Sequence, residues 1–211
     1  MRIVFLVTAS PHDHARNPPH VLSWHDASDV LLAKAKRASS SACAILGITG
    51  PVGAGKSTLA RLLSPCIIAT DDYLPDYDAL PYHERDKPEH ADFPLLRAHL
   101  SALRRGEAAQ VPVWSFQTHR REGSREVRPS PIIVVEGIHA LHDHLLDALD
   151  LRIYVDAPKA TRWSRWEAIE SRGERGWGVE AARQYFHEVA EPTFHAAGYR
   201  ERADYVVVNE G

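Results

Sequence analysis

The chain has 211 residues, 44% of them hydrophobic and 25% charged, which is enough to bury one substantial core but hardly two independent domains. Its net charge of −3 comes from intermixed acidic and basic residues, so the clustered basic surface of a nucleic-acid binder is not expected. No apolar run approaches the roughly 20 residues of a membrane span, and the start of the chain does not read as a secretory signal.

The order of predicted elements is that of a mostly parallel sheet covered by helices, since short β-branched runs alternate with longer segments of helical period. The predicted strands are Ile3–Thr8, Ala44–Thr49, Ile67–Thr70, Ile132–Val135, Arg152–Val155 and Tyr205–Val208. The predicted helices are Ser28–Ala38, one that starts near Lys56, Phe93–Arg105, Lys159–Ser171 and Val179–Ala190. Asp92 is expected to cap the third helix, Gly106 to end it, and Pro192 to end the last.

Two segments break this alternation. Residues 110–128 read as two short strands joined by a polar turn, which predicts a β-hairpin insertion outside the parallel sheet, a common place for substrate contacts. Residues 9–29 are rich in Pro, His and Asp, and we expect a surface connection that runs into the first helix. The histidines of this stretch match no metal-site spacing.

The stretch GPVGAGKST, residues 50 to 58, follows the second predicted strand and matches the phosphate-loop pattern G-x-x-x-x-G-K-S. Glycines let the backbone curl until successive N–H groups converge on phosphate oxygens, Lys56 neutralises the outer phosphates, and the Ser57 hydroxyl can ligate Mg²⁺. A chance match in a chain of this composition is on the order of one in six hundred, so an incidental glycine-rich turn is the weaker interpretation. The residues expected to bind ATP are Gly50, Pro51, Val52, Gly53, Ala54, Gly55, Lys56, Ser57 and Thr58.

Several classes of nucleotide-binding protein fit poorly. Thr58 stands where a dinucleotide-binding fingerprint needs a third glycine. Neither asparagine, Asn17 or Asn209, precedes a lysine, so the chain lacks the base-reading motif of a GTPase. The strand IIVVEG ends in the single acid Glu136, whereas motor and chaperone ATPases usually end the corresponding strand in Asp-Glu. A small-molecule kinase fits best.

Two acids follow buried strands. Ligands bind beyond the carboxyl ends of the strands in an open parallel sheet, and Asp71 follows CIIAT there as Glu136 follows PIIVV. Phosphoryl transfer needs a metal on the outer phosphates and a carboxylate that orients the acceptor hydroxyl and takes its proton. We assign the second role to Asp71, which Asp72 could share or exchange, and expect Ser57, Glu136 and Asp71 near the metal. Taken alone, each carboxylate could equally be a helix cap.

The segment DAPKATRWSRWEAIESRGERG carries four arginines after the fifth predicted strand. Arg162 and Arg165 lie three apart on one helical face, and Arg172 and Arg175 follow near a glycine-containing turn. Such a group predicts a mobile lid over residues 159–177 that brings positive charge to the transferring phosphate. We expect the first pair to act in catalysis and the second pair to bind ATP, with a solvated basic face as the alternative.

Seven ordered stretches resemble the uridine kinase group of the P-loop kinase superfamily, which also holds phosphoribulokinase and bacterial pantothenate kinase. They run from about Ile45 to Val208 and read GPVGAGKSTLA, ATDDY, DKPEHADFPLL, VPVWSFQTH, VVEGIHAL, YVDAPKATRWSR and RADYVVV. The resemblance implies one P-loop kinase domain over residues 1–211, an α/β three-layer fold with a mostly parallel central sheet, a hairpin at the substrate site and an arginine-bearing helical lid. Residues 1 to about 40 fall outside it as an N-terminal extension.

The resemblance also implies roles for individual residues. Asp71 falls on the catalytic base of the family, and Asp86 of DKP on the aspartate that holds the ribose hydroxyls. Trp114, Phe116 and His119 occupy hairpin positions that the family presents to a pyrimidine. Trp114 and Phe116 share a face of their strand, which on its own we would assign to the core, and the His119 ring could hydrogen-bond a pyrimidine carbonyl.

The chain departs from the family pattern in the acceptor region. Ser115 stands for the usual aspartate, Lys87 for a histidine, Leu74 for a common tyrosine, and RGERGW for a denser arginine run. Tyr73 is a candidate to replace the missing tyrosine, and Arg162 is expected to contact the substrate as well as the phosphate. These departures bear on the identity of the acceptor and leave the prediction of a kinase intact.

The leading hypothesis is an Mg²⁺-dependent transfer of the γ-phosphoryl group of ATP to the 5′-hydroxyl of uridine or cytidine. The alternatives are the same reaction on another small alcohol, such as pantothenate, a sugar phosphate or nicotinamide riboside, and a nucleotide-binding regulator without turnover. The expected partners are ATP and a small-molecule acceptor, with no nucleic acid or membrane, and a homo-oligomer is left open. Cys43 and Cys66 each open an apolar run and suit buried thiols in a reducing compartment, which predicts a cytoplasmic protein.

Overall fold

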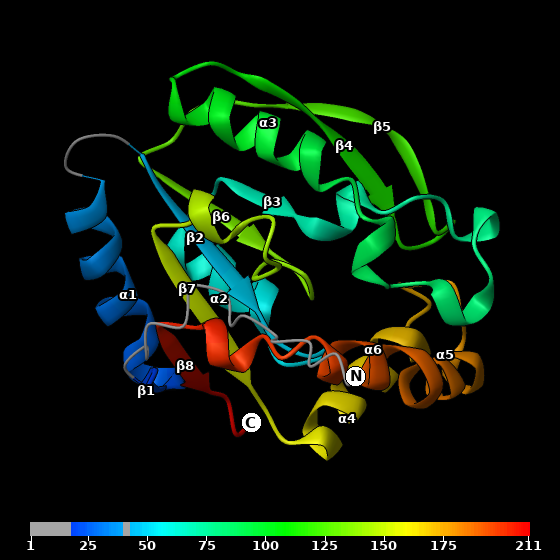
Figure 1. Ribbon diagram of the computed structural model, residues 1–211. Coiled ribbons are helices and arrows are strands. Elements are labelled where there is room, and N and C mark those ends of the chain that lie inside the picture. The colour runs from blue at the N-terminus through cyan, green and yellow to red at the C-terminus, as the bar shows by residue number, and fades with distance from the viewer. Residues whose placement is uncertain (1–17, 40–42) are drawn as a thin grey trace, which may run out of the picture.

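The structure, a computed structural model, describes residues 18–39 and 43–211 (Figure 1). Within these residues a parallel sheet has the strand order β1-β8-β7-β2-β6-β3, and β4 pairs with β5 in a separate antiparallel sheet. The strands of the parallel sheet are β1 (His20–Ser23), β2 (Ala44–Thr49), β3 (Ile67–Ala69), β6 (Ile132–Glu136), β7 (Leu151–Asp156) and β8 (Tyr205–Val208). The predicted α/β fold with a mostly parallel central sheet is therefore confirmed, while the predicted strand Ile3–Thr8 lies outside the described residues.

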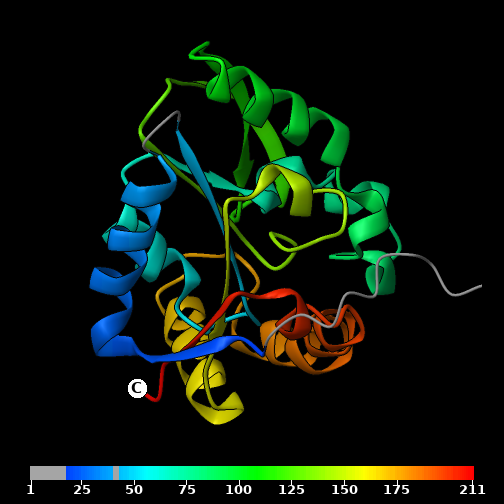
Figure 2. The ribbon, with the colours of Figure 1, turned by 60° about the vertical axis from the view of Figure 1, so that its left-hand side comes forward.

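Helices cover both faces of this sheet because its central strand is apolar on both sides. The helices are α1 (Trp24–Ala38), α2 (Lys56–Leu63), α3 (Phe93–Arg104), α4 (Lys159–Ser171), α5 (Val179–Tyr185) and α6 (Glu191–Ala196). Every residue of β2 is buried, and since side chains alternate along a strand, Leu46 and Ile48 pack with α1 and α2 whereas Ile45 packs with α3. Figure 2 shows α1 and α2 on one side of the sheet and α3 on the other.

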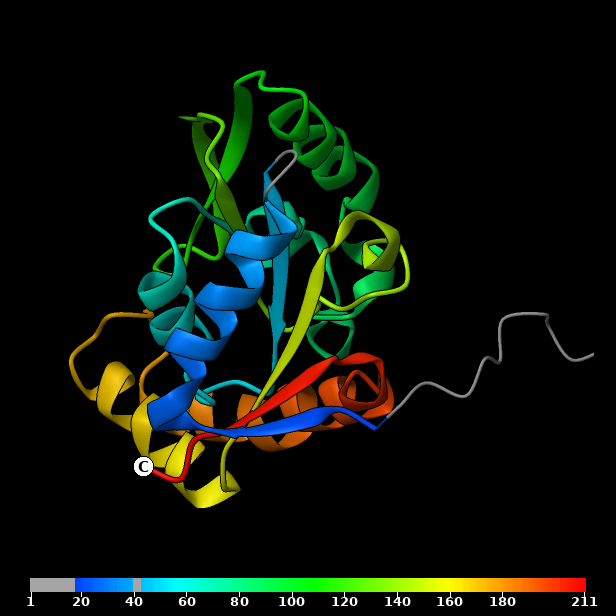
Figure 3. The same cartoon turned by 90° about the vertical axis from the view of Figure 1, so that its left-hand side faces the viewer.

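The N-terminal part of the described chain adds a sheet strand that the sequence pattern did not predict. Residues His20–Ser23 pair in parallel with β8, and Figure 3 shows the two strands side by side at the edge of the sheet. Ser23 then caps α1 by accepting a hydrogen bond of 3.2 Å from the N–H of Asp26, so that α1 begins four residues before the predicted Ser28. The prediction of a surface connection through residue 29 was wrong from His20 on, because four residues are too few to show a strand period.

The C-terminal helical region runs further than predicted. α5 continues through a π-helical turn, Phe186–Ala190, directly into α6. Pro192 was expected to end the helix, but it is the second residue of α6, directly after the π-helical turn, where the helical hydrogen-bond pattern already changes. The prediction for α4 agrees at both ends, and α3 begins after Asp92, whose side chain accepts a hydrogen bond of 3.1 Å from the N–H of Leu95.

The predicted hairpin over residues 110–128 is confirmed as β4 (Ala109–Ser115) and β5 (Arg120–Val127). It packs on α3 through one apolar face and extends past the carboxyl edge of the parallel sheet (Figure 1). Cys43 and Cys66 are free thiols that are only half-buried, rather than buried as expected, and burial raises the pKa of both. In the described part of the chain, no helix combines the length and the apolarity that a membrane crossing requires.

Candidate active site

The phosphate loop joins β2 to α2 at the carboxyl edge of the sheet. Lys56, the first residue of α2, is buried, and its Nζ donates a hydrogen bond of 3.0 Å to the carbonyl oxygen of Pro51. Burial lowers the pKa of Lys56, although the nearby carboxylates of Glu136 and Asp71 oppose this shift. A bound triphosphate would supply the further negative charge that stabilises the ammonium form.

Side chains from distant segments fix the outer side of this loop. Three side chains donate hydrogen bonds to backbone carbonyl oxygens of the loop. Arg162 donates to residue 52 at 3.3 Å, Arg165 to residue 53 at 3.1 Å and Asn209 to residue 54 at 2.8 Å. Arg165 also donates to the side-chain oxygen of Asn209 at 3.1 Å. The conformation of the loop is therefore held by α4 and by the residue that follows β8, so it does not depend on the loop sequence alone.

Arg162 does not take the position that the sequence predicted. Only 3% of its surface is exposed, and its guanidinium makes a two-point ion pair with Glu191 of α6, in which Nη2 and Oε2 are 2.8 Å apart. Its role as a catalytic and substrate-binding lid residue is thus corrected to that of a buried support beneath the phosphate loop. Helical spacing indicated that Arg162 and Arg165 share a face of α4, but only packing decides how deeply each one is buried.

A groove of about 520 Å³ runs along the phosphate loop. Its lining includes most of the residues predicted to bind ATP and metal, namely Val52, Gly53, Gly55, Lys56, Ser57, Thr58, Asp71, Glu136, Arg172 and Arg175. Arg165, which was predicted to act in catalysis, lines it as well. The predicted ATP ligands Gly50, Pro51 and Ala54 do not line the groove and belong to the supporting backbone of the loop. Arg172 is exposed and pairs with Glu174.

Asp71 and Glu136 both reach this groove from the ends of β3 and β6. The Ser57 hydroxyl donates a hydrogen bond of 2.9 Å to Oε1 of Glu136. Burial, reinforced by the negative charges of Glu136 and Asp86, raises the pKa of Asp71 to about 7. Asp72 is turned away and accepts a hydrogen bond of 2.9 Å from the backbone N–H of Trp114, so it does not share the role.

The donors beside the groove fit a magnesium ion. The Ser57 hydroxyl and the Glu136 carboxylate are hard oxygen ligands of the type that Mg²⁺ prefers. Among the residues that the structure describes, no three His, Cys, Asp or Glu side chains gather closely enough to hold a metal alone. In kinases, Mg²⁺ takes several of its ligands from phosphate and water.

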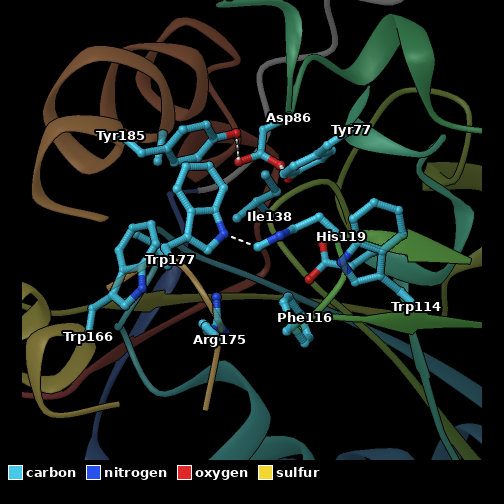
Figure 4. A pocket seen from close by; sticks show the side chains of 13 residues that line it. Tyr77, Asp86, Trp114, Phe116, His119, Ile138, Trp166, Arg175, Trp177 and Tyr185 are labelled. Atoms are coloured by element: carbon cyan, nitrogen blue, oxygen red, sulfur yellow. Dashed lines mark hydrogen bonds between the residues drawn. The ribbon is translucent and has the colours of Figure 1, made fainter. Parts of the chain in front are cut away.

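Asp71 also lines a second, aromatic cavity (Figure 4). The sequence predicted Asp86, Trp114, Phe116 and His119 as substrate contacts, and the structure brings all four together there. The remaining lining residues are Val52, Tyr77, Ile138, Trp166, Arg175, Trp177, Tyr185 and Ala190. The cavity and the groove therefore meet at Asp71, with Val52, Phe116, Ile138 and Arg175 also common to both.

Two phenols hold the carboxylate of Asp86. The hydroxyl of Tyr185 donates a hydrogen bond of 2.8 Å to Oδ2, and the hydroxyl of Tyr77 donates to Oδ1 (Figure 4). The backbone of Asp86 has φ +60°, and its carbonyl oxygen accepts a hydrogen bond of 2.6 Å from Nε2 of buried His139. The other ring nitrogen of His139 accepts from the hydroxyl of Tyr199 at 2.9 Å. This network fixes a backbone conformation that is otherwise uncommon for aspartate.

His119 lies in the hairpin turn with its ring stacked on Tyr77, at 5.5 Å between centroids and 7° between planes. Burial, together with the charges of Arg85 and Arg175, lowers the pKa of His119 to about 4. The imidazole is therefore neutral at neutral pH and offers one donor and one acceptor. Its Nε2 accepts a hydrogen bond from the indole N–H of Trp177 (Figure 4).

Tyr73 is not part of this site. Its side chain is fully buried in the core beside α3, and its hydroxyl is hydrogen-bonded to Nδ1 of His99 at 2.8 Å. Tyr77, four residues further along the chain, enters the cavity instead. The sequence did not predict four residues of this site, which are Tyr77, His139, Trp177 and Tyr185. Two of them had a visible signal, since Trp177 lies between Gly176 and Gly178 and His139 belongs to the stretch VVEGIHAL.

Comparisons with known proteins show the family of the chain. A profile of the phosphoribulokinase/uridine kinase family matches residues 80–202. The chain is 35% identical over 160 residues to a uridine kinase of Halobacterium salinarum, an alignment that covers 70% of this chain and 71% of that protein. The chain belongs to the phosphoribulokinase/uridine kinase family. As a member of that family it is an ATP-dependent small-molecule kinase, as the sequence motifs predicted.

Further relatives and solved structures extend the family likeness. A uridine kinase of Clostridium botulinum is 35% identical over 162 residues, with 70% of this chain and 78% of that protein covered. The fold resembles that of a proposed fructose transport system kinase from Silicibacter sp. TM1040, with a TM-score of 0.66 and 21% identity over 85% of this chain and 98% of the other. The fold also resembles that of a possible uridine kinase from Bacillus stearothermophilus, with a TM-score of 0.57 and 22% identity. That comparison covers 87% of this chain and 98% of the other.

Proposed function

We propose that this kinase transfers the γ-phosphoryl group of ATP to the 5′-hydroxyl of uridine or cytidine, with Mg²⁺ held by Ser57 and Glu136. The observation that carries the proposal is that Asp71 lines both the phosphate-loop groove and the aromatic cavity. An alcohol that enters from the cavity thus reaches the terminal phosphate beside one carboxylate. The names of the curated relatives support a pyrimidine nucleoside as that alcohol.

On the donor side, the phosphate loop and Lys56 hold the triphosphate, and Arg165, Arg172 and Arg175 of the groove screen its charge. When bound, Mg²⁺ neutralises charge on the outer phosphates. The Ser57 hydroxyl and the Glu136 carboxylate fix where that charge lies in the groove. The remaining task of the chain is to orient the acceptor, because phosphoryl transfer depends mainly on positioning and charge stabilisation.

On the acceptor side, Asp71 takes the proton of the 5′-hydroxyl as its oxygen forms the new bond to the γ-phosphorus. The bond from that phosphorus to the β–γ bridging oxygen breaks, and ADP leaves. Asp86 can accept hydrogen bonds from the ribose hydroxyls, because each carboxylate oxygen keeps a lone pair beyond the one that its phenol uses. Neutral His119 can bind the edge of the base, and Phe116 can cover its face.

A panel of acceptors tests the proposal. Uridine, cytidine, pantothenate and nicotinamide riboside are each incubated with MgATP, and ADP release and the phosphorylated product are measured. Uridine or cytidine is expected to give the highest kcat/KM. Preference for a different alcohol would overturn the pyrimidine assignment and leave the family membership in place.

The base is tested in the same assay. Asp71→Asn should lower kcat by about 10² to 10⁴-fold, because it removes the proton acceptor, while ATP still binds. The neighbouring Asp72→Asn is the matched control, since an amide oxygen can still accept from the N–H of Trp114. Undiminished turnover in Asp71→Asn would show that another group takes the proton.

A further inference from the structure

The aromatic cavity is smaller than the base that it would bind. Its volume is about 60 Å³. A buried cavity of about 150 Å³ in another protein holds one benzene molecule, and a pyrimidine ring is a planar six-membered ring of similar size. At least one lining side chain therefore has to move before a nucleoside can enter.

Trp177 lines this cavity between Tyr185 and His119 (Figure 4). Its ring stands at 90° to that of His119, with 4.8 Å between the centroids, and lies 4.3 Å from the ring centroid of Tyr185. Its indole N–H occupies Nε2 of His119, the acceptor that the N3–H of uracil or the amino group of cytosine could use. The chain thus fills its own base subsite with an aromatic ring and a hydrogen-bond donor.

Trp177 is also well suited to move. It lies in the loop between α4 and α5, whereas Trp114, Trp166 and Tyr185 sit on a strand and two helices. Gly176 and Gly178, on either side of it, have φ of +72° and +76°, a backbone conformation that other residues rarely adopt. Rotation at these glycines can withdraw the indole without displacing a helix or a strand.

The loop that carries Trp177, residues 172–178, spans the cavity to reach the hairpin turn. Gln117 donates a hydrogen bond of 2.6 Å to the carbonyl oxygen of Gly173, and the guanidinium of Arg175 lies 4.3 Å from the ring centroid of Phe116. Arg175 lines both the cavity and the phosphate-loop groove. The loop that places Trp177 in the aromatic cavity thus also carries a positive charge that lines the phosphate-loop groove.

We propose that Trp177 is a specificity-determining residue that fills the base subsite of the free enzyme and that the acceptor must displace. This inference rests on the proposed function. It predicts that a small alcohol or water, which gains little from the aromatic cavity, leaves Trp177 in place and is a poor acceptor. A pyrimidine nucleoside replaces both the ring contacts and the hydrogen bond to His119, so it can compete.

Steady-state kinetics of Trp177→Ala test this proposal. If Trp177 fills the subsite about nine-tenths of the time, its removal should lower the uridine KM about tenfold, because the competent form is then always populated. The KM for ATP should stay within about twofold, since the ring does not line the groove. Trp163→Ala is the matched control, because Trp163 packs in the same helical cluster but does not line the cavity, and it should leave both values unchanged.

An unchanged or raised uridine KM in Trp177→Ala would overturn the inference, since a raised value would mean that the indole stacks on the bound base. A second measurement does not depend on turnover. In protein labelled with 5-fluorotryptophan, the ¹⁹F signal that is lost in Trp177→Phe belongs to Trp177, and uridine with ADP should shift it toward the solvent-exposed position. A signal that does not move would overturn the inference.

The two proposals fail differently. If neither the wild type nor Trp177→Ala phosphorylates uridine or cytidine, the proposed function is wrong. The KM comparison and the ¹⁹F titration are then made with the alcohol that the acceptor panel identifies. A lowered KM and a shifted signal with that alcohol would still support displacement of Trp177, and the opposite results would overturn it.

Discussion

The substitution Asp71→Asn is expected to stabilise the free protein while it removes the catalytic base. Burial, with the charges of Glu136 and Asp86, raises the pKa of Asp71 from 3.8 to about 7. In the unfolded chain the same carboxyl group ionises near its ordinary value. Between these two pH values the folded state keeps a proton that the unfolded state has released, so the free energy of unfolding falls as the pH rises.

The size of the effect follows from the difference between the two pKa values. A difference of about 3 units corresponds to about 4 kcal/mol once the pH exceeds 7. Asparagine has nearly the shape of the protonated carboxyl group and carries no charge. Asp71→Asn should therefore be more stable than the wild type by up to about 4 kcal/mol at pH 8 and nearly equal to it at pH 4.

Urea unfolding of both proteins, without nucleotide and at several pH values from 4 to 8, measures this difference. The comparison at pH 4 serves as the internal control, because the folded wild type then holds a neutral carboxyl group at this position. A difference that does not change with pH would show that folding does not raise the pKa of Asp71, and a variant that is less stable at pH 8 would show that folding stabilises its ionised form. Either result would refute the reasoning.

Two further substitutions test the corrected positions. Glu191→Gln should lower the free energy of unfolding by about 3 kcal/mol, because it leaves the buried guanidinium of Arg162 without its counter-charge. Urea titration measures this loss, and the control is Glu188→Gln, at an exposed residue. A change near zero would speak against a buried ion pair. Tyr73→Phe should lower the free energy of unfolding by about 1 kcal/mol, because it removes the hydrogen bond to His99. It should leave the uridine KM unchanged, and a raised KM would show that Tyr73 contacts the substrate.

Much of the fold and of the donor site was predictable because it depends on residues that are neighbours in the sequence. The phosphate loop, the strands from β2 onward, the hairpin and α4 follow from local patterns of glycine, β-branched and amphipathic residues. The position of Asp71 and Glu136 at one edge follows from the rule that parallel strands end together. These features need no knowledge of how distant segments pack.

The acceptor site was decided by contacts between segments far apart in the sequence. The indole of Trp177 meets His119 across 58 positions, and the phenol of Tyr185 meets Asp86 across 99. Likewise, Arg162 became a buried support because Glu191 of another helix lies against it. Local spacing tells which side chains share a face, but whether that face meets solvent, substrate or another helix depends on the packing of the whole chain, and only the tertiary structure shows it.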